Sequence, residues 1–198
     1  MKSSRENSRG ADNQQERPDK QNWLSKIPEH IGWYLSGFCD GEGSFNASLR
    51  KRKDHKIGWQ IVITFNVAQR DVSNLKLLQN QLGCGRLQAR RDGVHYFVVT
   101  DYKLILERVV PFFLKFELQS KDKKLNFTLF KEIATMMNRG EHLKDKGFQK
   151  IVELREMLNK GKGRTRKYNK LDVLVNQESS ETIRQTLAVK TRSHIEKI

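Results

Sequence analysis

One acidic residue in an unfavourable position is the first sign of chemistry in this sequence. Glu42 lies in the tetrapeptide Asp40-Gly41-Glu42-Gly43, directly after a short apolar segment with helical spacing. A carboxylate at the negative, C-terminal end of a helix is unfavourable by roughly 0.3 kcal/mol or more. The flanking glycines commonly end a helix, so Glu42 would lie at this unfavourable end. A bound cation would offset its charge, and we therefore expect a cation to bind at Glu42 and the Gly41 backbone.

Small residues in the same segment indicate close contact with another helix. Gly costs about 1 kcal/mol relative to Ala in a helix interior, so Ser36 and Gly37 need a compensating role. Gly37 and Gly41 are four residues apart and lie on one helix face, where they let a second backbone approach closely.

The segment around Glu42 resembles a known motif. Residues 35–43 read LSGFCDGEG and are similar to the LAGLIDADG motif of homing endonucleases, and the flanking Tyr34, Ser44 and Phe45 fit as well. An ordinary capped helix that runs into a strand is the alternative interpretation of this segment, so the remainder of the chain has to decide.

The composition favours a polyanionic partner. The 198 residues contain 38 Lys and Arg against 23 Asp and Glu, a formal net charge of +15. No long amphipathic helix with a basic face is evident, so nucleic acid is favoured over an anionic membrane. No run approaches the roughly 18 apolar residues of a membrane span, and the N-terminus lacks a secretory signal. We expect an intracellular protein, in the bacterial cytoplasm or an organelle, with no membrane or small-molecule partner.

Cysteine and histidine spacing gives no sign of a metal cluster. Cys39 and Cys84 lie far apart and outside any C-x-x-C or Cys/His array, so we expect small buried residues. The five histidines are scattered without the spacing of zinc ligands, which makes a zinc-dependent nuclease a weak interpretation.

The hydrophobic periodicity predicts alternating helices and hairpins. The predicted order is a helix at 28–40, strands at 44–52 and 58–69, a helix at 72–82, strands at 86–90 and 94–100 joined by a two-residue turn at Asp92-Gly93, and a helix at 104–110 broken near Pro111. This order predicts an α+β fold in which helices cover one face of an antiparallel sheet.

The uncovered face of this sheet is rich in Arg, Asn and Gln, which pair bidentately with guanine or adenine edges in the major groove. A basic loop after residue 157 would contact phosphates, with a disordered linker as the equal alternative. The predicted DNA-binding residues are Ser44, Asn46, Ser48, Arg50, Arg52, Gln60, Thr64, Asn66, Arg86, Gln88, Arg90, His95, Arg164, Arg166 and Lys167.

The resemblance to LAGLIDADG proteins extends over most of residues 30–160. It implies an α-β-β-α-β-β-α fold with a curved antiparallel sheet as a DNA-binding saddle. Gln69 resembles the glutamine near the cleavage centre and Lys121 the lysine that opens the next helix and reaches the active site. Residues 140–155 resemble the helical tail of the branch found in introns of ribosomal RNA genes. Without the resemblance, Lys121 is a solvated charge and Gln69 a helix cap.

The chain divides into three parts by composition. Residues 1–22 are polar and basic and are expected to be a disordered arm. Residues 23–160 form the endonuclease-like domain. Residues 161–198 hold the basic loop and a short helix at 179–187 that begins with a capping sequence.

The motif tetrapeptide occurs once, whereas cutting both strands of a duplex needs two active centres. The resemblance therefore implies a homodimer that packs through Ser36, Gly37, Asp40 and Gly41. It also implies Mg²⁺ held by Glu42, with Mn²⁺ or Ca²⁺ able to replace it in binding. Lys121 would stabilise charge on the phosphate, and Gln69 would orient water.

These features predict a site-specific, Mg²⁺-dependent double-strand DNA endonuclease that promotes mobility of its host intron. Strands of about ten residues cover about ten base pairs per subunit, so a homodimer would read a long pseudo-palindromic site. The alternatives are an RNA-binding intron maturase and a catalytically inactive DNA-binding relative.

Overall fold

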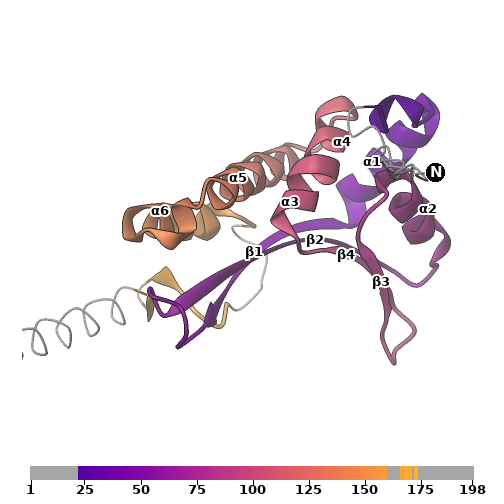
Figure 1. The fold of residues 1–198 in the computed structure, drawn as a ribbon. Helices are drawn as coiled ribbons and strands as arrows, with labels where there is room; N and C mark the ends of the chain where they lie inside the picture. Colours follow the sequence, from indigo (N-terminus) through magenta and orange to yellow (C-terminus); the bar gives the residue numbers. More distant parts are fainter. Residues whose placement is uncertain (1–21, 160–165, 171, 174–198) are drawn as a thin grey trace, which may run out of the picture.

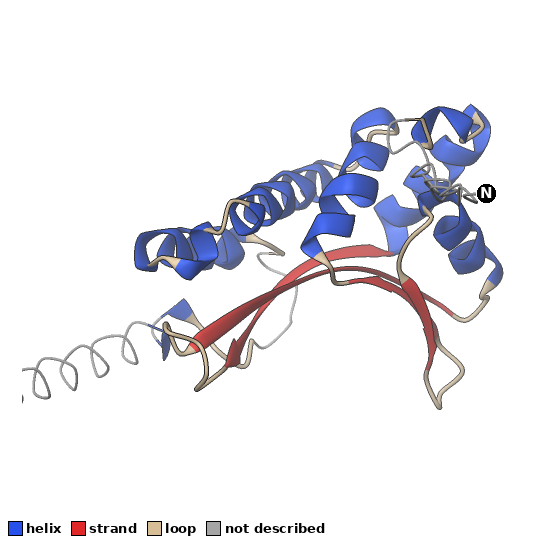
Figure 2. Cartoon of the chain, in the orientation of Figure 1, coloured by secondary structure: helices blue, strands red, loops and turns tan. Residues whose placement is uncertain are grey.

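A computed structural model describes residues 22–159, 166–170 and 172–173. In this part of the chain, helices lie over one face of a curved antiparallel sheet (Figures 1 and 2). The predicted N-terminal arm up to residue 21, Arg164 and the predicted helix at 179–187 lie outside the described residues. No helix in the described residues is long and apolar enough to cross a membrane.

The motif helix runs directly into the first strand. After a 3-10 turn at Leu24–Lys26, helix α1 spans Glu29–Glu42 and strand β1 spans Gly43–Lys51. The helix thus ends two residues beyond the predicted boundary of Asp40. Of the two glycines expected to end it, Gly43 is the C-cap, and its N–H donates to the Cys39 carbonyl, whereas Gly41 lies within the helix. Gly43 is extended, with φ −71° and ψ 150°, and a Cβ there would overlap the Cys39 carbonyl oxygen. Glycine is therefore required at this junction because no side chain fits there, and not because the backbone is left-handed.

The sheet has four strands in the order β1-β2-β4-β3. Strand β2 spans Trp59–Gln69 and pairs with all of β1, from Gly43 opposite Val67 to Lys51 opposite Trp59. Strands β3 and β4 span Arg86–Ala89 and His95–Val99, and helix α2, Ser73–Leu82, connects the two hairpins. The sheet arches beneath the helices, which cover its convex side and leave the concave side open (Figure 2).

The second hairpin turns differently from the prediction. The Gly93 N–H donates to Arg90 O at 3.2 Å, so Arg91 and Asp92 are the central residues of the turn. Gly93 follows with φ +77°. This is the three-residue type of hairpin loop, in which a glycine in the left-handed region closes a turn, and the predicted two-residue Asp92-Gly93 turn is wrong.

The helix predicted to break near Pro111 instead continues through it. It comprises α3, Tyr102–Leu104, a π-helical stretch at Ile105–Val109, and α4, Val110–Lys115. Pro111 lies in the first turn of α4, where its missing N–H is tolerated. The wider π-helical turn precedes the proline and marks the point at which the hydrogen-bonding pattern changes.

Two longer helices complete the convex layer. Helix α5 spans Lys121–Asn138, and α6 spans Asp145–Met157 after a 3-10 turn at Glu141–Leu143. Phenylalanines from the strands and helices join the layers: the Phe45 ring stacks on Phe65 at 5.2 Å and meets the edge of Phe113 at 5.7 Å between centroids. These rings are almost fully buried, so the sheet and helices share one core.

We expect Gly32→Ala to destabilise the fold, because an added Cβ would overlap the buried Phe116 ring. Overpacking of this kind costs about 1–3 kcal/mol. Urea unfolding followed by circular dichroism measures the change. His30→Ala, at an exposed position of the same helix, is the control and should change the free energy of unfolding by less than about 0.5 kcal/mol. Equal stability of Gly32→Ala and the parent would contradict this packing.

Candidate functional site

A hollow lies where the motif helix meets the start of α5. Its walls come from the end of α1, the start of β1, the first turns of α5 and Asn159, two residues after the end of α6. The lining residues are Asp40, Gly41, Gly43, Ser44, Ser120, Lys121, Asp122, Lys123, Asn126 and Asn159. The fold thus brings Lys121 to the backbone on both sides of Glu42, from about 80 residues further along the chain.

Asp40 is the anchor of this hollow. Its carboxylate accepts hydrogen bonds from Ser120 N at 2.9 Å, Ser120 Oγ at 2.7 Å and Gln119 N at 3.3 Å. Carboxylates suit the free N–H groups at the start of a helix, so Asp40 fixes the position from which Lys121 begins α5. Asp40, which was predicted at a dimer contact, thus makes these hydrogen bonds within its own chain.

Two lysines of α5 differ in what they contact. Lys121 is exposed at the rim of the hollow, as expected for a side chain that meets a partner. Lys123 is partly buried, and its Nζ donates to the carbonyl oxygen of Gly43. The sequence prediction missed Lys123, although its position two residues after Lys121 in the same basic run was the available signal.

The oxygen donors of the motif suit a hard divalent cation. Glu42 is an exposed carboxylate at the last position of α1, and the Gly41 backbone lines the hollow. No group of three or more His, Cys, Asp or Glu residues within the described part of the chain forms a metal site. Mg²⁺ commonly takes one or two carboxylates and completes its shell with phosphate oxygens and waters, so this donor set fits Mg²⁺ only with further oxygen ligands.

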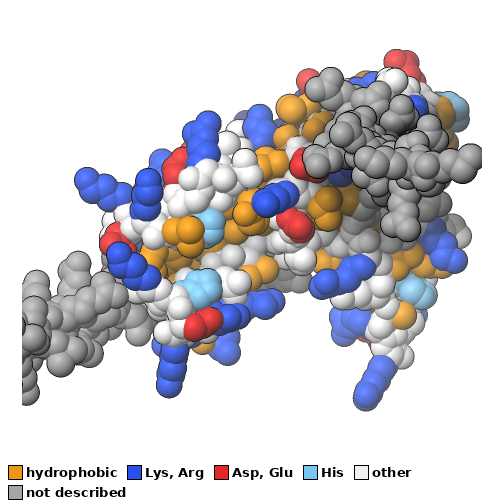
Figure 3. Space-filling model, viewed as in Figure 1, with side chains coloured by type: hydrophobic (Ala, Val, Ile, Leu, Met, Phe, Trp, Pro, Cys, Tyr) orange, Lys and Arg blue, Asp and Glu red, His pale blue; other side chains and the backbone are white. Residues whose placement is uncertain are grey.

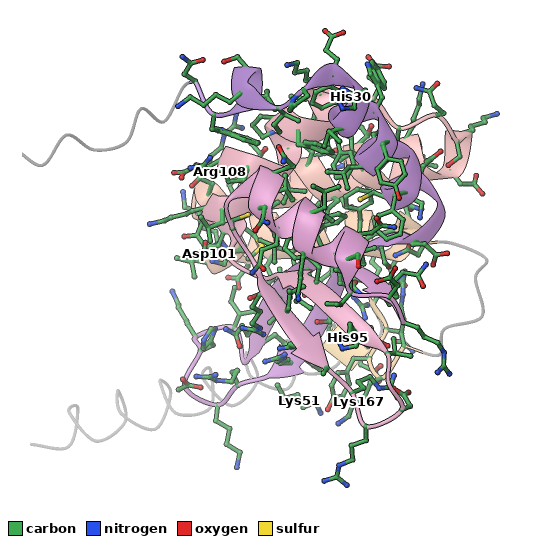
Figure 4. The ribbon with its side chains drawn as sticks, turned by 90° about the vertical axis from the view of Figure 1, so that its right-hand side faces the viewer. His30, Lys51, His95, Asp101, Arg108 and Lys167 are labelled. Atoms are coloured by element: carbon green, nitrogen blue, oxygen red, sulfur yellow. The ribbon has the colours of Figure 1, made fainter. Side chains whose placement is uncertain are left out.

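Gln69 and His95 lie outside the hollow, opposite each other at the end of β2 and the beginning of β4. Gln69 comes two residues after Val67, the partner of Gly43, and its Oε1 accepts from Arg70 N at 3.1 Å. His95 Nδ1 lies 3.0 Å from Arg70 O. In the alternation along each strand, both residues fall on the face of the sheet that carries the buried side chains, and not on the open concave face. In Figure 4, His95 lies in the lower part of the molecule, far from His30.

The concave face carries the predicted polar residues in register. Ser44 lies opposite Asn66, Asn46 opposite Thr64, and Arg50 opposite Gln60. Strand β3 adds exposed Arg86 and Gln88, and Lys and Arg side chains project below the arch at both of its ends (Figure 3). The sequence analysis missed Tyr96, which lies opposite Gln88 and whose hydroxyl accepts from Arg90 at 3.0 Å.

Three of the predicted DNA-binding arginines already have acidic partners within the chain. Arg52 binds Asp54 through two hydrogen bonds of 2.7 and 2.8 Å, and this partner lowers the pKa of the Asp54 carboxyl. Arg90 lies 3.1 Å from Asp92. Arg166 is half-buried and binds Glu156 at 2.6 Å and the carbonyl of Leu158.

These three pairs differ in accessibility. The pairs of Arg52 and Arg90 are exposed, and exposed ion pairs contribute at most about 1 kcal/mol, so a phosphate could replace the acid. Arg166 instead fastens the segment after α6 to the domain through Glu156 and the Leu158 carbonyl, and its role as a phosphate contact stays a prediction. Lys167 remains exposed.

The predicted helix contact surface is only partly available. Gly37 and Gly41 are exposed, and an added Cβ at either position would meet no atom within 4 Å. Ser36 is 1% exposed and donates to the Phe116 carbonyl at 2.8 Å. Ser36 therefore faces the core, and its predicted place on a dimer surface is wrong.

The cysteines have no role in the hollow. Both are free, with Cys39 buried and Cys84 half-buried. Burial raises the pKa of the Cys84 thiol to about 11, and burial also raises the pKa of Cys39. The expectation of a buried cysteine is thus confirmed for Cys39, whereas Cys84 is only half-buried.

Comparison with known proteins identifies related sequences. The profile of the family described as LAGLIDADG endonuclease matches residues 35–134. "Probable intron-encoded endonuclease 2" of Neurospora crassa is 30% identical over 154 residues, which are 72% of this chain and 34% of that protein. "DNA endonuclease I-CvuI" of Chlorella vulgaris is 30% identical over 105 residues, 50% of this chain and 63% of that protein. The chain thus spans less than two thirds of the length of either relative.

Solved structures share the architecture. The crystal structure of a homing endonuclease, I-TnaI, has a TM-score of 0.64 and 31% identity over 75% of this chain and 96% of that one. The archaeal intron-encoded homing endonuclease I-Vdi141I, complexed with DNA, has a TM-score of 0.72 and 26% identity over 78% of this chain and 98% of that one. The predicted α+β saddle fold is therefore confirmed.

We expect Asp40→Ala to loosen the start of α5, because three donors lose their acceptor. The loss should be about 1–3 kcal/mol in unfolding free energy, with faster amide exchange at residues 118–122. Asp40→Asn keeps one carbonyl acceptor in the same place and should lose less. Unchanged exchange at these residues in Asp40→Ala would contradict the anchoring role.

Proposed function

The chain belongs to the LAGLIDADG endonuclease family, and on this premise we propose that it is a homing endonuclease. As a homodimer it cuts a long, pseudo-palindromic DNA site and promotes mobility of the intron that encodes it. The observation that carries this proposal is the position of Ser44, which lines the hollow beside Glu42 and also begins the polar concave face. One strand thus connects a cation-binding acid to a surface suited to base edges.

Residues in and near the hollow would have different roles. Glu42 and the Gly41 carbonyl would hold Mg²⁺, which when bound polarises the phosphate and lowers the pKa of a coordinated water. Exposed Lys121, held in place by Asp40 through Ser120, faces negative charge on the scissile phosphate. Gln69 would orient water from the end of β2. Mn²⁺ and Ca²⁺ have the same preference for oxygen ligands and would support binding.

The concave face fits duplex DNA. Strands β1 and β2 span 9 and 11 residues, and at about 3.3 Å per residue they follow about ten base pairs. The side chains on this face are those that pair with purine edges. The net charge of +15 supplies the attraction to phosphates that binding needs.

A second copy of the chain completes the site. One chain offers a single motif acid, whereas two cuts need two centres. The exposed Gly37 and Gly41 on α1 leave room for the same helix of a second copy to approach. Such a contact brings both Glu42 carboxylates to the two-fold axis.

Substitution of the motif acid tests the enzyme. We expect Glu42→Gln to bind DNA but to cut it on the order of 1,000-fold more slowly, because several kcal/mol of charge stabilisation are lost. The measurement is cleavage of a plasmid that carries the DNA flanking this reading frame, joined without the intervening sequence, in the presence of Mg²⁺. Glu29→Gln, at the other end of the same helix, is the matched control and should cut like the parent.

Two results would contradict the proposal. Tight binding by the parent without cutting would indicate an inactive DNA-binding relative, and preference for the intron RNA over this duplex would indicate a maturase. Equal cutting by Glu42→Gln and the parent would show that another group holds the metal.

The dimer contact gives an independent prediction. We expect Gly37→Leu to raise the dimer dissociation constant by at least about tenfold, since a large side chain separates two closely packed helices. The fold itself should persist because the position is open in the single chain. Sedimentation equilibrium measures this, with Asn80→Leu on the exposed surface of α2 as control. A monomeric parent, or no change in Gly37→Leu, would contradict the proposed contact.

A further inference from the structure

Three side chains hold the outer edge of strand β1. Because β1 is the first strand of the sheet, alternate carbonyls point away from β2 and need other donors. Lys123 Nζ donates to Gly43 O, Asn159 Nδ2 donates to Phe45 O at 2.7 Å, and Arg155 Nε donates to Ala47 O at 3.1 Å. We call Lys123, Asn159 and Arg155 the edge clamp.

Asn159 is the member of the edge clamp with the most constrained backbone. Its φ of 55° is the one positive value of a non-glycine residue in the described part of the chain, and Asn tolerates this region better than most residues. Its N–H donates to Oδ1 of Asn126 at 2.8 Å. Asn126 is 9% exposed and belongs to α5, so the helix layer fixes Asn159 from behind.

The same side chain reaches the polar face. Asn159 Nδ2 lies 3.4 Å from Asn46 Oδ1. Asn46 Nδ2 in turn donates to Ser44 Oγ and to Asn66 Oδ1, both at 2.9 Å. A chain of amide contacts therefore links α5, through Asn159, to three side chains of the concave face. Asn159 and Asn126 also line the hollow beside the motif.

We propose that Asn159 is a positioning residue that sets the fidelity of DNA reading next to the cleavage site. It acts by fixing the Phe45–Asn46 segment of β1 relative to the hollow, and needs no DNA contact of its own. This inference rests on the proposed endonuclease function.

The geometry limits which base pairs are affected. Asn46 comes three residues after Gly43, or about 10 Å along β1, whereas Arg50 comes seven residues after it, at about 23 Å. Freeing the Phe45 carbonyl therefore loosens the reading of base pairs nearest the two-fold axis. Arg50 and Gln60, which pair near the other end of the hairpin, keep their positions.

The edge clamp also shows why Asn159 is the informative member. Arg155 is 5% exposed and further binds Glu156 at 2.7 Å and the Tyr168 carbonyl at 2.9 Å. Removing a buried, hydrogen-bonded cation strongly destabilises a protein, so Arg155 variants would lower the stability of the whole fold and could not isolate the position of β1. The Asn159 side chain can be removed while its backbone conformation and its bond to Asn126 remain.

Two substitutions distinguish the effect of the Asn159 side-chain donor from the effects of backbone conformation and of charge. Asn159→Gly keeps the positive φ and the N–H bond but has no donor for Phe45 O. Asn159→Asp keeps the shape but also cannot donate to a carbonyl. The probe is the joined flanking-sequence duplex described above, with each base pair substituted in turn, and the readout is the cleavage rate of each substituted duplex relative to the parent duplex.

We expect both variants to lose about fivefold to tenfold of their discrimination at the innermost base pairs, the equivalent of one hydrogen bond, and to keep discrimination at the outer pairs. Arg50→Ala should give the reverse pattern. Asn159→Asp should also weaken binding evenly through its added charge, and this even loss becomes smaller at high salt. A discrimination profile of Asn159→Gly equal to the parent's, or loosened evenly at all positions, would overturn the proposal.

A measurement without DNA separates this inference from the proposed function. In the free protein, amide exchange at residues 43–48 should be faster in Asn159→Gly than in the parent, while exchange in α2 is unchanged. If the parent does not cut but this exchange difference is present, the endonuclease proposal fails and the fixing of β1 stands. If exchange at residues 43–48 is unchanged, Asn159 does not position β1.

Discussion

The attachment of strand β1 is the constraint on which the rest of this structure depends. Helix α1 passes into β1 without a linking residue, so Glu42 and the polar face of β1 share one rigid backbone. Gly43 permits this junction because any side chain there would overlap the Cys39 carbonyl. Asp40 ties the junction to the start of α5, and the edge clamp holds the outer carbonyls of β1. Glu42, Lys121 and the polar face of β1 are therefore placed by one set of contacts.

The arginines of the protein differ in how available they are to an anionic partner. Of the predicted DNA-binding arginines, Arg52 and Arg90 are in exposed ion pairs, whereas Arg166 is half-buried against Glu156. Exposed pairs are weak and can yield to phosphates, but a half-buried pair with a second bond to a carbonyl is retained. The ion pairs thus separate arginines that are available to a polyanion, Arg52 and Arg90, from Arg166, which stabilises the fold.

In the proposed homodimer, the hollow beside the motif would form half of the site. Gly41 and Lys121 line it, Glu42 follows directly after Gly41, and the described residues contain no three-ligand cluster. A cation held there by so few protein oxygens would depend on phosphate and water for its remaining ligands, so the proposed metal binding would be coupled to the presence of DNA. In this proposal the exposed glycines of α1 would join the two halves, whereas the Ser36 hydroxyl donates within the chain to the Phe116 carbonyl.

The amino-acid sequence by itself determined the order of helices and strands up to about residue 110 and the polar face of the sheet, because these depend on local periodicity and capping, which neighbouring residues encode. The start of a helix at Lys121 followed from the resemblance to LAGLIDADG proteins. Only the tertiary structure decided which side chains meet across the chain: Lys123 contacts Gly43 from 80 residues away and Asn159 contacts Phe45 from 114. Such contacts follow from how α5 and α6 cross the edge of β1, and no local pattern encodes that crossing. The same reason explains the error at Ser36, whose residue type suits a surface but whose partner, the Phe116 carbonyl, lies within the fold.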